Sequence, residues 1–145
     1  MAVLKKYSDM PVDLDELSKI VIDSVFMVHK ELGPGYLERI YEEALIFELE
    51  SRDIPVQRQQ AVSVRYKGKV LPTEYKIDLM IDNRIILELK TVEKILPVHE
   101  AQIISYMKQS GILLGFIVNF NEVLIKNGIK RMVLSHDLRS FASSR

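Results

Sequence analysis

The chain has 145 residues, of which 48% are hydrophobic and 28% charged, and its 20 basic residues balance 20 acidic ones. These values predict one globular domain, residues 1–145. We expect its core over about 12–134, between flexible ends. The lack of cysteine excludes disulfides and Cys-ligated zinc or iron–sulfur sites. A net charge of zero does not indicate non-specific coating of nucleic acid, which needs many phosphate contacts.

No apolar run approaches the ~18 residues that a membrane-spanning helix needs. The N-terminus also lacks an apolar core followed by a small-residue cleavage site. We therefore expect a cytoplasmic protein that makes no membrane contact. Residues 1–12 and the polar tail from Ser135 are expected to be flexible ends.

The first predicted helix runs from an N-cap at Asp13 to about Leu32, where Gly33-Pro34-Gly35 stops it. His29 lies near its C-terminus, where the helix dipole favours a positive side chain, so we expect a capping or surface role rather than metal binding. Apolar residues recur along this helix mostly at spacings of three and four: Leu14, Leu17, Ile20, Val21, Val25 and Val28.

A second helix is predicted over about 37–52. Glu38 lies near its N-terminus, where the helix dipole favours a carboxylate, and this structural role is one explanation for it. Glu38 also shares a flank with Tyr41 and Leu45, so it could instead point toward a sheet. The side expected to be buried is formed by Leu37, Ile40, Tyr41, Ala44, Leu45 and Phe47.

Three strands in a meander are predicted next, over 56–66, 70–81 and 84–90. Lys67-Gly68-Lys69 forms the first turn, and Pro72 predicts an irregular start to the second strand. A two-residue loop at Asp82-Asn83 would place Asp78 opposite Leu87.

A loop one residue longer sorts the side chains of the second hairpin better, because alternate residues of a strand point to opposite faces. It places one apolar set on one face, with the pairs Ile81–Ile85, Leu79–Leu87 and Ile77–Leu89. The other face then carries Met80–Ile86, Asp78–Glu88 and Lys76–Lys90. We expect this longer loop.

This register brings the carboxylates of Asp78 and Glu88 together, and like charges opposite one another on a sheet repel. Either one of them has a raised pKa, or a divalent cation binds between them. Lys90 shares their face, and two acids with a lysine suit metal-assisted hydrolysis. The simpler alternative is a solvated sheet face with a Lys–Glu pair, because short motifs occur often by chance.

A third helix is predicted over 98–110, with His99, Gln102 and Tyr106 on one face. The apolar run 112–120 suits a strand that is buried on both faces. Two short strands, 123–125 and 129–134, should form a hairpin around Lys126-Asn127-Gly128. No phosphate-binding glycine loop and no zinc-type histidine spacing occurs.

These motifs together resemble the GxxExxY family, a small-protein branch of the PD-(D/E)XK nuclease superfamily. The resemblance spans roughly 12–134 and depends on G-x-x-E-x-x-Y at 35–41, then Asp78, then Glu88-Leu89-Lys90, then Gln102 and Tyr106. It implies an α/β fold with a mixed sheet and a restriction-endonuclease-like core. That core is helix, three-stranded meander, helix and strand, here with an extra N-terminal helix and a C-terminal hairpin.

The resemblance also implies roles for these residues. Asp78, Glu88 and the Leu89 backbone carbonyl would bind Mg²⁺ or Mn²⁺, and Glu38 would complete the metal site. Lys90 would orient or activate the attacking water and stabilise charge on the phosphate. Support of the site or contact with substrate is implied for Gln102, Tyr106 and Tyr41. The alternative for Gln102 and Tyr106 is a helix face that hydrogen-bonds the sheet.

The implied function is metal-dependent hydrolysis of phosphodiester bonds in nucleic acid, with DNA favoured over RNA. One alternative is a catalytically silent module on the same fold that binds nucleic acid or protein. Another is an α/β scaffold that assembles with a partner, which exposed apolar surface on the first helix or the terminal hairpin would favour. A homodimer would extend the binding surface.

Overall fold

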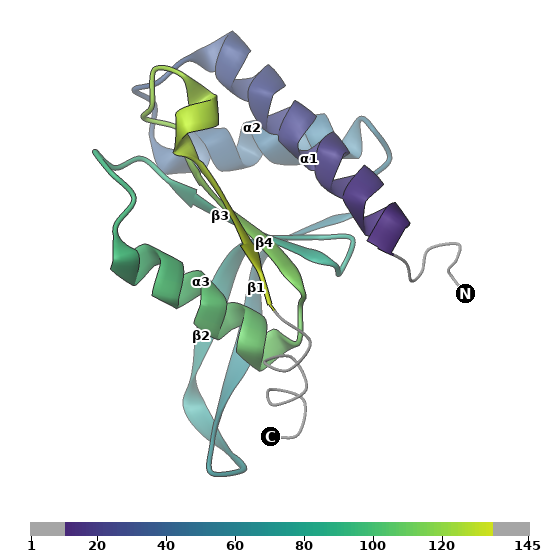
Figure 1. Ribbon diagram of the computed structural model, residues 1–145, viewed down its shortest axis with the longest axis vertical. Helices are drawn as coiled ribbons and strands as arrows, with labels where there is room; N and C mark the ends of the chain where they lie inside the picture. The colour runs from purple at the N-terminus through teal and green to yellow at the C-terminus, as the bar shows by residue number, and fades with distance from the viewer. Residues whose placement is uncertain (1–10, 135–145) are drawn as a thin grey trace.

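The computed structural model describes residues 11–134, which fold into three layers (Figure 1). Two helices cover one face of a five-stranded sheet, and one helix covers the other face. The helices are α1 (Pro11–Leu32), α2 (Glu38–Glu50) and α3 (Pro97–Ser110), with a 3₁₀ turn η1 (Ile125–Gly128). The strands are β1 (Val56–Tyr66), β2 (Lys69–Ile81), β3 (Ile85–Lys90), β4 (Leu114–Asn119) and β5 (Ile129–Val133).

The strands lie in the order β1-β2-β3-β4-β5. Neighbouring strands are antiparallel except β3 and β4, which are parallel and are joined by the crossover through α3. The predicted mixed α/β class, with a meander of three strands followed by a helix and a strand, is confirmed. Within residues 11–134, no helix is long and apolar enough to cross a membrane. A flexible end was expected over 1–12, but Pro11 and Val12 belong to α1. The rest of that segment, 1–10, and the tail from Ser135 lie outside the described residues.

The register of the β2–β3 hairpin is the one predicted from side-chain alternation. Leu79 pairs with Leu87 and Ile81 with Ile85, which leaves a three-residue loop. Asp82 and Asn83 both have positive φ, 51° and 55°, a conformation that Asp and Asn tolerate better than most residues. The turn residues therefore fit the longer loop.

Apolar side chains form two clusters, one on each face of the sheet. The first cluster packs α1 and α2 against residues such as Leu79, Leu87 and Phe116, and the second packs α3 against Met80 and Ile86. Strand β4, which lies between β3 and β5, is buried along its whole length, as predicted. The sheet is therefore covered by helices on both faces.

The prediction that Ile77 shares a face with Leu79 is wrong. Ile77 belongs to the cluster under α3, whereas Leu79 belongs to the cluster under α1 and α2. The alternation of β2 therefore breaks at Asp78. Gln59, which lies across from Asp78 on β1, has φ of 51° and interrupts the pairing between Arg58–Leu79 and Gln60–Ile77.

The predicted hairpin around Asn127-Gly128 does not form. Residues 125–128 are a 3₁₀ turn, and β5 pairs instead with β4, so that β4 and β5 make the C-terminal hairpin. Neither Asn127 nor Gly128 has the positive φ that a type I′ turn needs. Gly128 is required for a different reason, because a Cβ there would lie 2.5 Å from the backbone oxygen of Asn119.

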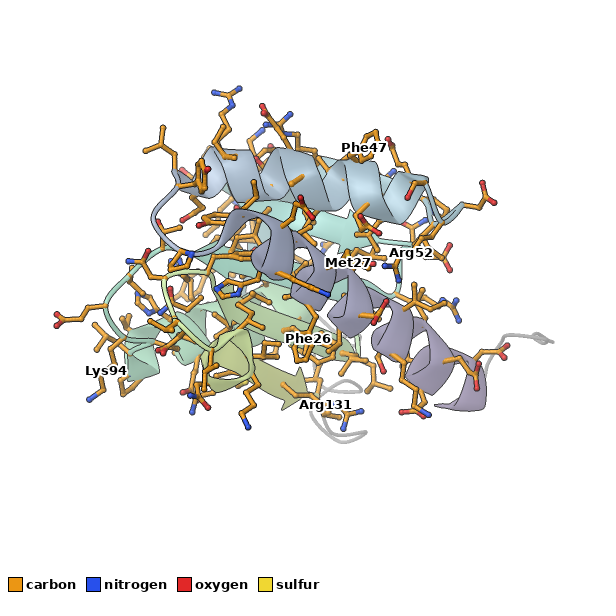
Figure 2. All side chains as sticks on the ribbon, turned by 90° about the horizontal axis from the view of Figure 1, so that it is seen from above. Phe26, Met27, Phe47, Arg52, Lys94 and Arg131 are labelled. Atoms are coloured by element: carbon orange, nitrogen blue, oxygen red, sulfur yellow. The ribbon has the colours of Figure 1, made fainter. Side chains whose placement is uncertain are left out.

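Two details of the predicted helices also differ. Helix α1 begins at Pro11, so Asp13 lies in its first turn rather than at its N-cap. The buried side of α2 is Tyr41, Glu42, Leu45 and Leu49, whereas Leu37, Ile40 and Phe47 are exposed. Figure 2 shows Phe47 on the side of α2 away from α1. Three of the six residues assigned to the buried side were therefore placed wrongly.

Polar contacts tie α1 to its neighbours. Arg52, which Figure 2 shows where the end of α2 meets α1, pairs with Asp23 of α1 at 2.8 Å and with Glu48 at 2.9 Å. His29 is buried rather than at the surface as expected, and its Nε2 lies 2.8 Å from the backbone oxygen of Glu122. Its ring also stacks on Phe120. His29 is thus a buried core residue.

Candidate active site

The candidate site lies where the ladder between β2 and β3 stops. The last pair of the ladder is Leu79–Leu87, and beyond it two carboxylates accept the backbone N–H groups that the ladder leaves free. The Asp78 N–H donates to Oε2 of Glu88 at 3.1 Å, and the Leu89 N–H donates to Oδ2 of Asp78 at 2.9 Å. Asp78 and Glu88 are therefore held side by side, as the register predicted.

The expected repulsion between these acids appears in the pKa of Glu88. Glu88 is 5% exposed, and its burial, together with the charge of Asp78, raises its pKa to about 8. Burial also raises the pKa of Asp78, against the opposing effect of the Leu89 N–H, and Glu42 adds to the increase. At neutral pH the Glu88 carboxyl is therefore largely protonated when no cation is present.

Glu38 and Lys90 complete a group of four interacting charges. Glu38 is the first residue of α2, and partial burial followed by the charge of Asp78 raises its pKa. Lys90, at the end of β3, lowers the pKa of Glu38, Asp78 and Glu88 through its positive charge. Lys90 forms no ion pair with these acids in the part of the chain that the structure describes. Its ammonium therefore remains available to water or phosphate.

Glu42 and Gln59 belong to the site although the sequence did not indicate them. Glu42 is 7% exposed, and its Oε2 accepts a hydrogen bond from Nε2 of Gln59 at 2.8 Å. The same Nε2 lies 3.4 Å from Oδ1 of Asp78, so Gln59 bridges α2 to β2. The spacing of Glu38 and Glu42, one helical turn apart, was the available signal for Glu42. No pattern in the sequence marked Gln59.

A cleft of about 460 Å³ opens beside these residues, between the start of α2 and the sheet. Arg58 lies on its wall and pairs with Glu42 at 3.2 Å and with Glu43 at 3.4 Å. The lining residues are Glu38, Arg39, Glu42, Arg58, Gln59, Asp78 and Leu89. The cleft therefore gives a ligand access to Glu38 and Asp78.

The remaining predicted residues divide into three cases. Tyr106, on α3, is buried, and burial followed by the charge of Glu88 raises its pKa to about 12. Gln102 is exposed on α3, and no contact within residues 11–134 joins its side chain to the acids.

Tyr41 is fully buried. Its hydroxyl donates to the backbone oxygen of Gly33 at 2.5 Å and accepts from the Tyr36 N–H at 3.1 Å. Its ring also stacks on Phe120 with 4.3 Å between the ring centroids. Tyr41 therefore fixes the loop before Glu38 and does not face the cleft.

The carboxylate oxygens at the site are suitable ligands for a divalent cation. They do not, however, surround a single position. The charge of Asp78 raises the pKa of both Glu88 and Glu38, and a cation would relieve that repulsion. The Leu89 N–H points toward Asp78, and in a strand the carbonyl of the same residue points to the same side. Across residues 11–134, however, no three acidic or histidine side chains are close enough to hold a metal ion.

Residues 15–132 match the sequence model of the PD-(D/E)XK nuclease superfamily. The match includes Glu38, Asp78, Glu88, Lys90, Gln102 and Tyr106. The five-stranded mixed sheet between helices is consistent with the restriction-endonuclease-like fold of that superfamily. No curated protein and no solved structure matches the chain.

Proposed function

Because the chain belongs to the PD-(D/E)XK nuclease superfamily, we propose that it is an active nuclease that hydrolyses phosphodiester bonds, preferably in DNA, with Mg²⁺ or Mn²⁺ as cofactor. The observation that carries this proposal is the group Asp78, Glu88 and Lys90 at the end of the β2–β3 ladder, beside an open cleft. We further propose that the chain belongs to the GxxExxY family, because Gly35, Glu38 and Tyr41 stand at the positions of that motif. A cytoplasmic location stays a prediction.

Asp78, Glu88 and the Leu89 carbonyl would hold the cation, with Glu38 reaching it from α2. A bound divalent cation polarises a phosphoryl oxygen and lowers the pKa of water. Lys90 would orient the attacking water and stabilise negative charge on the phosphate. Because these acidic side chains are not gathered around one point within residues 11–134, they must rearrange to hold the cation. We therefore expect metal binding to be weak without nucleic acid.

The test is cleavage of single- and double-stranded DNA and RNA with Mg²⁺ or Mn²⁺, combined with calorimetric titration of the metal. We expect Asp78→Ala, Glu88→Ala and Lys90→Ala each to lower the cleavage rate by about 100-fold or more. Glu74→Ala is the matched control, since Glu74 is an exposed acid on the same strand β2, and it should cleave like the wild type. Absence of metal binding at millimolar concentration, even with nucleic acid present, would overturn the catalytic proposal.

Assembly with a partner is a second candidate function, and one observation favours it. Phe26 and Met27 of α1 and Phe47 of α2 are exposed by 43%, 45% and 74%. Exposed apolar side chains of this size are typical of contact surfaces. Light scattering across a range of protein concentrations tests for a homodimer. A monomer that binds metal and cleaves DNA would remove this alternative.

A further inference from the structure

The chain is electrically neutral as a whole, but one segment is strongly basic. Between Asp53 and Glu74 there is no acidic residue, while Arg58, Arg65, Lys67 and Lys69 lie there. Arg58 is neutralised by two glutamates of α2. The other three gather at the tip of the β1–β2 hairpin, and their positive charge is not balanced locally.

We call residues 65–70 the arm. Figure 1 shows this hairpin tip extending beyond the end of α3, at the bottom of the view. Within residues 11–134, Arg65, Lys67 and Lys69 form no ion pair, and all three are exposed. Tyr66 is 60% exposed and Val70 50%, and Lys67 lies 5.5 Å from the centre of the Tyr66 ring. The arm thus presents positive charge and one aromatic ring to solvent.

A hydrogen bond to α3 anchors the base of the arm, whereas its tip is exposed to solvent. The backbone N–H of Arg65 donates to the Gln109 side chain of α3 at 3.0 Å. The register between β1 and β2 shifts between Ser63 and Arg65, opposite the stretch that contains Pro72. A shift of this kind bends a hairpin and increases its twist, which turns the tip away from the plane of the sheet. The arm is therefore a braced projection.

Its shape and its position fit one class of ligand. The tip turn, Lys67-Gly68, has only two residues, both with positive φ, so the arm is a narrow two-stranded ribbon. A ribbon of this width enters the major groove of B-DNA, whereas the major groove of an RNA duplex is too narrow. Asp78 is nine residues after Lys69 along β2, a span of about 30 Å along an extended strand. One turn of B-DNA is about 34 Å long.

We propose that the arm binds duplex DNA, entering the major groove about one helical turn from Asp78 and Glu88, with Arg65, Lys67 and Lys69 on the flanking phosphates. This inference rests on the proposed nuclease function and specifies its substrate as double-stranded DNA. It also explains how a neutral protein would hold a polyanion, because three basic residues without a nearby acid gather where the duplex would lie, at a distance from the acids of the site.

The first test is binding of a fluorescent 30-base-pair DNA duplex, measured by anisotropy in EDTA so that no cleavage occurs. Lys67→Gln/Lys69→Gln should weaken binding by roughly tenfold and lower the slope of log Kd against log salt by about 2, since each lost phosphate contact removes ~0.9. Lys67→Arg/Lys69→Arg should restore both. The matched control is Lys30→Gln/Lys126→Gln, which removes two exposed lysines elsewhere and should bind like the wild type.

Duplex length and type give the second test. The double Gln variant should lose little affinity for a DNA hairpin with a 6-base-pair stem, which is about 20 Å long and too short to reach both the site and the arm, and little for a 30-base-pair RNA duplex. Equal binding of the 30-base-pair DNA by wild type and variant would overturn the inference. So would arm-dependent binding to phosphatidylserine vesicles without binding to the duplex.

Failure of the two proposals can be told apart. If the arm variants weaken DNA binding but no protein cleaves DNA with Mg²⁺ or Mn²⁺, the nuclease proposal fails and the DNA-binding surface stands. If the wild type cleaves, Asp78→Ala does not, and the double Gln variant binds and cleaves like the wild type, the arm is not part of the DNA-binding surface. Equal melting temperatures would show that the arm variants fold normally.

Discussion

At the scale of single residues, Glu88 links the charge of the site to the stability of the fold. Its folded-state pKa of about 8 lies above the ordinary value of 4.5, so the folded protein binds a proton more tightly than the unfolded chain between these pH values. Stability therefore falls as pH rises through this window, by up to about 1.4 kcal/mol per pH unit. The raised pKa values of Asp78 and Glu38 act in the same direction.

We predict that Glu88→Gln removes much of this slope and is more stable than the wild type at pH 8. Urea unfolding at pH 5, 6, 7 and 8 measures it. Glu74→Gln, at an exposed position of β2, should keep the wild-type slope. Parallel curves for the wild type and Glu88→Gln would contradict the prediction.

Gln59 gives a second prediction, because its left-handed backbone in the middle of β1 is strained for any residue with a Cβ. Gln59→Gly should be more stable than Gln59→Ala by about 1 kcal/mol, although both lose the bridge to Glu42 and Asp78. At Gln57, which is exposed on the same strand and has no positive φ, alanine should be the more stable of the two. Urea unfolding of the four variants tests this, and the same order at both positions would contradict it.

The sequence allowed part of the site to be predicted at this scale. Alternation along two strands was enough to bring Asp78 and Glu88 together, because register follows from which residues must be buried. The role of Gln59 in the site could not be predicted, because it depends on a backbone distortion that no residue type in the sequence indicates. The hydrogen bond between Glu42 and Gln59 could not be predicted either, because it depends on how α2 packs against the sheet.

At the scale of elements, the C-terminal segment shows why one strong local signal failed. Asn127-Gly128 is a frequent hairpin turn, yet its glycine serves close approach to Asn119 rather than a positive φ. The apolar run over 112–120 was interpreted correctly because a strand buried on both faces has apolar residues at nearly every position. The Asn-Gly turn signal depends on only two residues. Here the tertiary contact with Asn119 determined the conformation of these residues instead.

Gly128→Ala is therefore predicted to destabilise the protein by about 2 kcal/mol or more, since the new Cβ would meet a backbone oxygen at 2.5 Å. Gly111→Ala is the comparison, because φ there is 76° but the space around a Cβ is open. It should lose only about 1 kcal/mol. Thermal and urea unfolding of both variants test this prediction. Equal losses in the free energy of unfolding would show that the structure around Gly128 relaxes to accept the new Cβ.

At the scale of the whole molecule, the order and types of nearly all elements followed from the sequence, whereas the pairing of β4 with both β3 and β5 did not. Local periodicity decides whether a segment is a helix or a strand, but strand order depends on contacts between distant segments. The covering of both sheet faces was implied only by the buried run of β4.

Metal binding should be visible in the stability of the entire fold. At a Mg²⁺ concentration ten times its Kd, we expect stabilisation by about 1.4 kcal/mol and a rise in Tm of about 4 °C. Chelation with EDTA should reverse the rise. Asp78→Ala should show no rise at the same concentration, and an equal rise in that variant would mean that the ion binds elsewhere.

The parallel pairing of β3 with β4 also bears on how the chain folds. Short segments, 67–68, 82–84 and 120–128, connect the strands of the antiparallel pairs β1–β2, β2–β3 and β4–β5, whereas Ile85 of β3 meets Leu114 of β4 only across the whole α3 crossover. Closing that longer loop loses more chain entropy, so we expect the two antiparallel halves to form first and this pairing last. Until then, two apolar strands have open edges, and the folding intermediate is most prone to aggregation there.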